Sequence, residues 1–162
     1  MAEHMLRRLL VHHAVPEGAV IVTSGGIAPY ARDGSLVSLD TRLALRDVDI
    51  HIDPDSGARD LKRGHRHLLE TADLVLTMTE EQVAMVRSSG AVRDGSPILT
   101  LRDLAGLGGD IDDPAGQDES VFEATRDAVA HALDHALPRL LPAAPERSRE
   151  TCPGCSRDPR PE

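Results

Sequence analysis

The chain alternates helical patterns with short apolar runs, and its first helical pattern begins at residue 2 with no strand before it. Residues 2–13 carry leucines at helical spacing, and the apolar run of residues 19–23 follows. In an α/β fold each helix leads from one parallel strand to the next, so this first helix lacks the strand that should precede it. We therefore expect that the sequence begins inside such a fold and that one strand is missing from its front.

Three short runs are expected to form buried parallel strands, because they are apolar and β-branched without polar alternation. These runs are residues 19–23, 73–78 and 97–101. Helical spacing predicts further helices over residues 36–45, 65–71, 79–87 and 120–137. Capping boxes are predicted at Thr79 with Gln82 and at Ser120 with Glu123, and Pro138 is expected to kink or end the last helix. The predicted class is α/β, a doubly wound open parallel sheet flanked by helices.

A length of 162 residues is typical of one domain. We expect that domain to span residues 1–142, because residues 143–162 are rich in Pro, Arg, Ser and Glu and contain few apolar side chains. This composition predicts a disordered C-terminal tail. Both cysteines, Cys152 and Cys155, fall in the tail, where an incidental motif is favoured over half of a zinc site or a dithiol because no second pair lies nearby.

The net charge of −9 and the lack of a basic stripe argue against nucleic acid and membrane surfaces as partners. An anionic substrate would need local positive potential at its site. No apolar run approaches the roughly 20 residues that span a bilayer, and no signal peptide is recognisable, so a cytoplasmic location is expected. His131 and His135 lie one helical turn apart, but they fall off the apolar stripe and are interpreted as solvated rather than metal-binding.

Several short segments are weak signals one by one, but their order along the chain is informative. Asp113-Pro114-Ala115-Gly116 is an Asp-Pro turn, and Thr23-Ser24-Gly25-Gly26 is a glycine turn after an expected strand. Together with residues 1–10, 58–61 and 72–78, these segments resemble, in order, the low-molecular-weight protein tyrosine phosphatases. Residues 1–10 resemble the helix that follows that family's Cys-x5-Arg-Ser-Pro loop, and residues 110–116 resemble its acid loop. The resemblance runs from residue 1 to about residue 141.

The resemblance implies hydrolysis of phosphotyrosine or another aryl phosphate in two steps, without cofactor or metal. A Cys thiolate attacks phosphorus, an Arg holds the equatorial oxygens, and an Asp protonates the leaving group and then activates water. Asp113 matches that general acid because it directly precedes Pro114, which favours it over the neighbouring Asp112. Without the other segments, Asp113 would be interpreted as an ordinary turn residue.

Other positions match the family with weaker implications. Ser24 corresponds to a serine that supports the nucleophile loop, although a serine in a glycine turn can simply satisfy backbone groups. Phe122 falls where the family often has Tyr near the substrate cleft, and it is equally well explained as an apolar anchor of the last helix. Arg59 matches a family segment or is a surface charge, and Ser56 falls near where many relatives have His.

The main departure from the family is that no cysteine precedes Cys152, so neither the nucleophile nor the loop Arg is in the sequence. The missing strand would be central, between residues 19–23 and 73–78. We expect the 162-residue chain to be inactive and Met1 to be an internal residue of a Ser-Pro-Met-Ala-Glu sequence, although a real truncation would look the same. The complete domain is expected to be a monomer, and the truncated chain could form a strand-sharing dimer.

Three interpretations follow from this resemblance. The first is a phosphatase that acts on a phosphotyrosine protein or a small aryl phosphate. The second is a catalytically inactive phosphatase-like module for binding or regulation. The third, a related arsenate reductase, requires additional cysteines in mid-chain, and no cysteine lies between residues 2 and 151.

Overall fold

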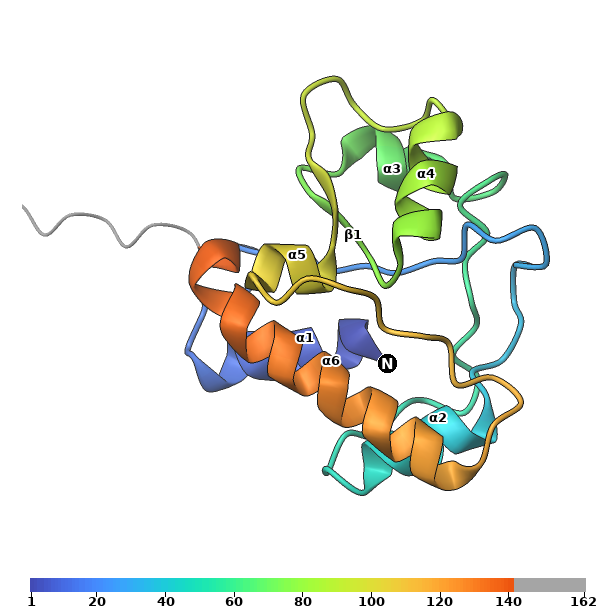
Figure 1. Ribbon diagram of the computed structural model, residues 1–162, viewed down its shortest axis with the longest axis vertical. Coiled ribbons are helices and arrows are strands. Elements are labelled where there is room, and N and C mark those ends of the chain that lie inside the picture. Colours follow the sequence, from blue (N-terminus) through green and yellow to red (C-terminus); the bar gives the residue numbers. More distant parts are fainter. Residues whose placement is uncertain (142–162) are drawn as a thin grey trace, which may run out of the picture.

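The computed structural model describes residues 1–141, whose elements alternate between helices and short parallel strands (Figure 1). Strands β1 (Val75–Thr77) and β2 (Ile98–Thr100) pair in parallel, with Val75 opposite Ile98 and Thr77 opposite Thr100. The helices are α1 (Ala2–His12), α2 (Leu39–Arg46), α3 (His67–Thr71), α4 (Glu80–Ser88), α5 (Leu101–Ala105) and α6 (Glu119–Leu140).

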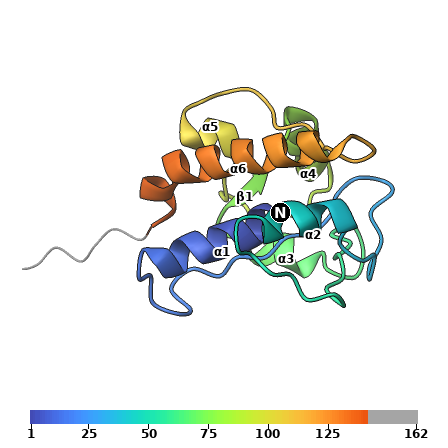
Figure 2. The same cartoon turned by 90° about the horizontal axis from the view of Figure 1, so that it is seen from below.

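Helices cover both faces of the sheet, which confirms the predicted α/β class. Side chains alternate across a strand, so Val75 and Leu76 point to opposite faces. Val75 packs with Ile98 against a cluster from α3, α4 and the following loop, made of Leu69, Val86 and Ala91. Leu76 packs against the larger cluster from α1, α5 and α6, whose members include Leu6, Leu10, Leu101, Val129 and Leu133. In Figure 1, β1 lies between α3 and α4 on one side and α6 on the other, and Figure 2 shows α1 running alongside α6.

The expected strand at residues 19–23 does not form, and this prediction was wrong. The segment is extended but pairs with no strand among residues 1–141, and only one side of it packs against the core. Val20 and Val22 contact the α1, α5 and α6 cluster, whereas Ile21 between them is 84% exposed. The run was interpreted as buried on both faces, but with one face covered it behaves as a half-buried extended segment.

The last helix is longer than its capping signals predicted. Helix α6 begins at Glu119 with Asp118 as its N-cap and no side-chain cap bond, so the capping box predicted at Ser120 and Glu123 does not form. The helix also continues past Pro138 to Leu140, with the Leu141 amide donating to the Leu137 carbonyl at 3.0 Å. A proline in the last turn removes only one backbone bond, which explains why the helix does not end there.

The capping box at α4 is confirmed in part. The Thr79 hydroxyl accepts a bond from the Gln82 amide at 3.3 Å, while the Gln82 side chain accepts from the Met78 amide at 2.9 Å, one residue before the expected partner. Sequence reasoning missed α5, a single turn that follows β2 directly and is capped by Thr100. The expected helix at residues 36–45 is shorter and begins after its cap, Ser38.

None of the helices within residues 1–141 is long and apolar enough to cross a membrane. The predicted tail, residues 143–162 with Cys152 and Cys155, lies outside the described residues.

Candidate active site

The first turn of α1 carries a buried carboxylate, Glu3, which is 8% exposed. A buried charge of this kind needs partners, and Glu3 has them in three directions. Arg7, one turn further along the helix, places its guanidinium 2.7 Å from the carboxylate. The Ser24 hydroxyl donates a hydrogen bond to it, and the Arg59 guanidinium lies 3.7 Å away.

The same two arginines bind the backbone at the end of the run of residues 19–23 and directly after it. Arg7 donates to the Val22 carbonyl at 2.6 Å, and Arg59 donates to the Ser24 carbonyl at 3.2 Å. Arg59, for which sequence left a surface charge as an alternative, is therefore engaged in the structure. These bonds fix the start of α1, the residues before the glycine turn and the segment around Arg59 relative to one another.

The glycine turn after Ser24 passes close to the segment around Arg59. The Gly26 amide donates to the Arg59 carbonyl at 2.8 Å, and the Leu61 amide donates to the Gly26 carbonyl at 3.1 Å, which forms an isolated parallel bridge. A Cβ atom on Gly25 would lie 2.6 Å from the Leu61 side chain and 2.8 Å from the Arg59 carbonyl. Glycine is therefore required at position 25 by close backbone approach.

The acid loop is attached to the carboxyl end of β1. The Ile111 amide donates to the carbonyl of Met78, the residue after β1, at 2.9 Å. Asp110 accepts a bond from the Glu80 amide at 3.1 Å, at the N-terminus of α4. Carboxyl ends of parallel strands are the usual position of ligand sites in open α/β sheets. Asp110 was not predicted as an anchor of this loop, because one acid among several near a turn gives no sequence signal.

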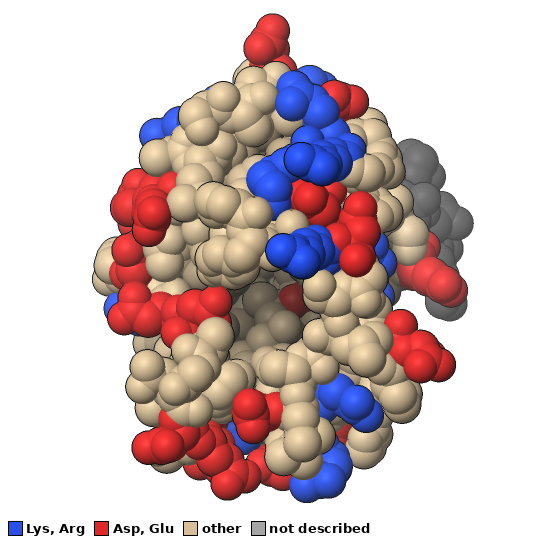
Figure 3. Space-filling view, turned by 90° about the vertical axis from the view of Figure 1, so that its right-hand side faces the viewer, with Lys and Arg blue, Asp and Glu red and all other residues tan. Residues whose placement is uncertain are grey.

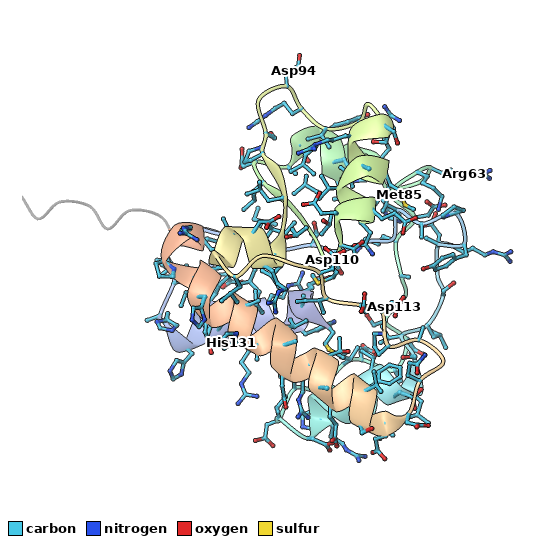
Figure 4. All side chains as sticks on the ribbon, viewed as in Figure 1. Arg63, Met85, Asp94, Asp110, Asp113 and His131 are labelled. Atoms are coloured by element: carbon cyan, nitrogen blue, oxygen red, sulfur yellow. The ribbon has the colours of Figure 1, made fainter. Side chains whose placement is uncertain are left out.

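Asp113 stands exposed on this loop, where Figure 4 shows it beyond Asp110. Its carboxylate accepts a bond from the Ala115 amide at 3.1 Å, and Gly116 completes the turn with a φ of +78°. Asp113 is thus a turn residue by local geometry while its side chain remains accessible to solvent. Its neighbour Asp112 is also exposed.

The acid loop and the N-terminal end of α1 both lie toward the side of the molecule that Figure 3 presents. That face is hollowed near its middle, with acidic side chains on one side of the hollow and a group of lysines and arginines above it (Figure 3). The arrangement offers an exposed carboxylic acid, a buried carboxylate held by two arginines, and a helix N-terminus. A helix N-terminus favours an anion.

The other predicted residues are less directly placed. Phe122 is 4% exposed, which is the burial of an apolar anchor on α6. Ser56 accepts a backbone bond from Val37 in a neighbouring loop. Sequence reasoning missed Glu3 and Arg7, although an acid and an arginine four residues apart in a first turn are a detectable pair.

The pKa shifts of two side chains in this region have local causes. Burial lowers the pKa of His4, and the neighbouring Met1 amino group and other charges act on it as well. The Lys62 backbone amide lowers the pKa of Asp60, which its side chain then reinforces. Within residues 1–141, no group of three or more His, Cys, Asp or Glu side chains is arranged to hold a metal ion.

Comparison with known proteins shows which proteins this chain is similar to. Residues 1–144 match the family model described as low molecular weight phosphotyrosine protein phosphatase. The chain is similar to the YwlE arginine phosphatase in a Cys-to-Ser mutant with a phosphorylated active-site serine, at 26% identity and a TM-score of 0.73, covering 86% of this chain and 85% of that one.

Two further solved phosphatase structures are also similar to this chain. The YwlE arginine phosphatase from Geobacillus stearothermophilus is 27% identical with a TM-score of 0.67, over 86% of this chain and 82% of that one. A low molecular weight protein tyrosine phosphatase from Bacillus subtilis is 25% identical with a TM-score of 0.70, over 86% and 85%. No curated protein sequence matches the chain significantly.

Proposed function

The chain belongs to the low molecular weight phosphotyrosine protein phosphatase family, and on this premise we propose that its domain hydrolyses phosphotyrosine or other aryl phosphates. The reaction would pass through a cysteinyl-phosphate intermediate, in a form of the protein that carries the family's Cys-x5-Arg loop. The observation that supports the proposal is the acid loop, which is fixed at the carboxyl end of β1 with the Asp113 carboxyl exposed.

Asp113 is the proposed general acid and base. In the first step the cysteine sulfur bonds to phosphorus, the bond from phosphorus to the aryl oxygen breaks, and the Asp113 carboxyl gives its proton to that oxygen. In the second step water attacks phosphorus, Asp113 takes a proton from the water, and the bond from sulfur to phosphorus breaks. The enzyme is returned to its starting state with inorganic phosphate as product.

Ser24 is the proposed support of the nucleophile loop. Its hydroxyl is held by Glu3, and its carbonyl is held by Arg59, so its position is fixed from two elements. A residue fixed in this way can orient a neighbouring loop without rearranging during the reaction. We assign the catalytic domain to residues 1–142 and expect the complete domain to be a monomer.

We also propose that the protein acts in the cytoplasm on a phosphoprotein or a small aryl phosphate. A catalytic thiolate requires a compartment that keeps thiols reduced. No nucleic acid or membrane partner is expected from a net charge of −9.

Phosphoarginine is a second candidate substrate. Two of the similar structures, at 26% and 27% identity, are described as arginine phosphatases. The steps at phosphorus would be the same, with Asp113 protonating a guanidine nitrogen in place of an aryl oxygen.

A binding or regulatory module without catalysis is the remaining candidate. It is favoured by the absence of any cysteine among residues 1–151. Under this alternative, the 162-residue chain would bind a phosphate ester and release no phosphate.

The test is the mass and turnover of the native protein purified from its source. We expect the native protein to release phosphate from para-nitrophenyl phosphate, and its mass, compared with the 17.4 kDa of the chain, shows which residues it contains. Peptides that carry phosphotyrosine or phosphoarginine then decide between the two substrates. A native product that begins at Met1 and releases no phosphate would favour the module without catalysis.

A further inference from the structure

A short basic segment interrupts an otherwise acidic chain. Residues 57–67 hold four cations and one acid, a net charge of +3, whereas the whole chain carries −9. Arg32, in the loop after the glycine turn, lies across a shallow cavity of about 280 Å³ from this segment. The cavity is lined by Pro29, Ala31, Arg32, Asp60, Lys62 and Arg63.

The two acidic side chains near this cavity already have hydrogen-bond and ion-pair partners. Asp60 accepts bonds from the Lys62 amide at 2.8 Å and lies 3.2 Å from the Lys62 ammonium. Asp33 accepts from the Asp60 amide and lies 3.3 Å from the His65 ring. Neither carboxylate is paired with Arg32 or Arg63, so local acids do not neutralise these two arginines.

Most of the nearby cations are engaged as well. Lys62 donates to the Ala31 carbonyl at 3.2 Å, and Arg59 is bound to Glu3 and Ser24. Arg66 forms an ion pair with Glu70 and binds two backbone carbonyls. By contrast, the side chains of Arg32 and Arg63 are exposed and make no hydrogen bond or ion pair among residues 1–141.

The two arginines are close in the chain to residues of the candidate active site. Arg63 is four residues from Arg59, which contacts Glu3 and Ser24, and Arg32 is eight residues from Ser24. Figure 4 shows Arg63 projecting from the side of the molecule that Figure 3 presents, where lysines and arginines gather above the hollow. A peptide whose modified residue entered the hollow could therefore extend over these cations.

We propose that Arg32 and Arg63 bind acidic side chains of the substrate protein that flank its phosphorylated residue. This deepens the proposed function and rests on it for the identity of the partner. A net charge of −9 repels an acidic substrate at long range, so two unpaired guanidinium groups on one cavity provide the local attraction it needs. Guanidinium groups suit this role because they pair with carboxylates in a bidentate geometry.

The test measures binding of the native protein to phosphate-free peptides by fluorescence anisotropy at low salt. One peptide carries a run of Asp and Glu, and its matched control carries Asn and Gln at the same positions. We expect only the acidic peptide to bind, and Arg32→Ala and Arg63→Ala each to weaken it by about three- to fivefold, as expected for an exposed ion pair. Binding should fall as salt is added.

Arg46→Ala is the matched control, because Arg46 is exposed on α2, away from the cavity. The proposal is overturned if the acidic peptide does not bind, if the two variants bind it as well as the wild type, or if Arg46→Ala weakens it equally. Because these peptides contain no phosphate, their result is independent of turnover. If the two variants lose binding and the native protein shows no phosphatase activity, the proposed function is contradicted but the acidic-peptide site is supported.

Discussion

The hydroxyl of Ser24 donates a hydrogen bond to the buried carboxylate of Glu3, 21 residues earlier in the chain. The bond joins the first turn of α1 to the glycine turn, and it does so at a charge that is almost completely removed from solvent. Because Glu3 also contacts Arg59, which binds the Ser24 carbonyl, the position of Ser24 is determined by two separate parts of the chain, the start of α1 and the segment around Arg59.

A double-mutant cycle should detect this relationship. Ser24→Ala removes one partner of a buried carboxylate, and hydrogen bonds to charged groups contribute about 1.5–3 kcal/mol, so the free energy of unfolding should fall by that amount. In a Glu3→Gln background the same change should cost less, because the acceptor is no longer charged. Urea denaturation of the four proteins measures the coupling, and strictly additive effects would show that the two side chains do not interact.

Gly25 should not tolerate a side chain. A Cβ atom there would meet both a side chain and a backbone carbonyl, so we expect Gly25→Ala to reduce the free energy of unfolding by about 1–3 kcal/mol. Gly95→Ala is the control, since it has open space around it and only the strain of a φ of +86°, with an expected cost of about 1 kcal/mol. Equal costs in thermal or urea unfolding would contradict the close approach at Gly25.

Two apolar substitutions distinguish the buried core from the half-buried segment at residues 19–23. Leu101 is 1% exposed, and Leu101→Ala should cost about 2–5 kcal/mol of unfolding free energy. Ile21 is 84% exposed, and Ile21→Ala should change stability by less than about 0.5 kcal/mol. A large effect at Ile21 would mean that residues 19–23 are buried on both faces in the native protein.

Much of the architecture was predictable because its signals are local. The strand at Val75–Thr77 and the helix at Glu80–Ser88 are marked by an apolar run followed directly by a threonine cap. The failures had non-local causes. Whether residues 19–23 form a strand depends on what lies beside them, which no periodicity within the run can reveal.

The candidate site was predicted less completely than the fold. Asp113 and Ser24 were assigned roles through their match to a family pattern, whereas Glu3 and Asp110 lie in matching segments but were assigned none. Their roles arise from contacts between residues that are 21 and 30 positions apart in the chain. An acid in a first helical turn also fits an ordinary solvated residue that favours the helix dipole, so its burial could not be read from sequence.

Asp60 should make stability depend on pH on the acid side. Its pKa in the folded protein is below the ordinary value of 3.8, chiefly because the Lys62 amide donates to the carboxylate. Its contribution is therefore present above about pH 4 and is lost as pH falls through the lower folded value. Asp60→Asn should be less stable than wild type at about pH 7, and urea midpoints should converge towards about pH 3.

Asp94→Asn is the control for this prediction, because Asp94 is exposed and its side chain makes no hydrogen bond or ion pair among residues 1–141. We expect that variant to follow the wild type across the same range. A difference between Asp60→Asn and wild type that does not narrow on acidification would show that the carboxylate charge is not what stabilises the loop.

The most direct test of the account is the turnover number of the native protein with Asp113→Asn, compared with Asp112→Asn. Both aspartates are exposed on the same loop, so the pair separates a role in proton transfer from a general effect of charge. The account predicts that Asp113→Asn lowers kcat for a phosphotyrosine peptide by about 10²- to 10⁴-fold, while Asp112→Asn leaves it nearly unchanged. Equal activity of Asp113→Asn and the wild type, or an equal loss in Asp112→Asn, would contradict it.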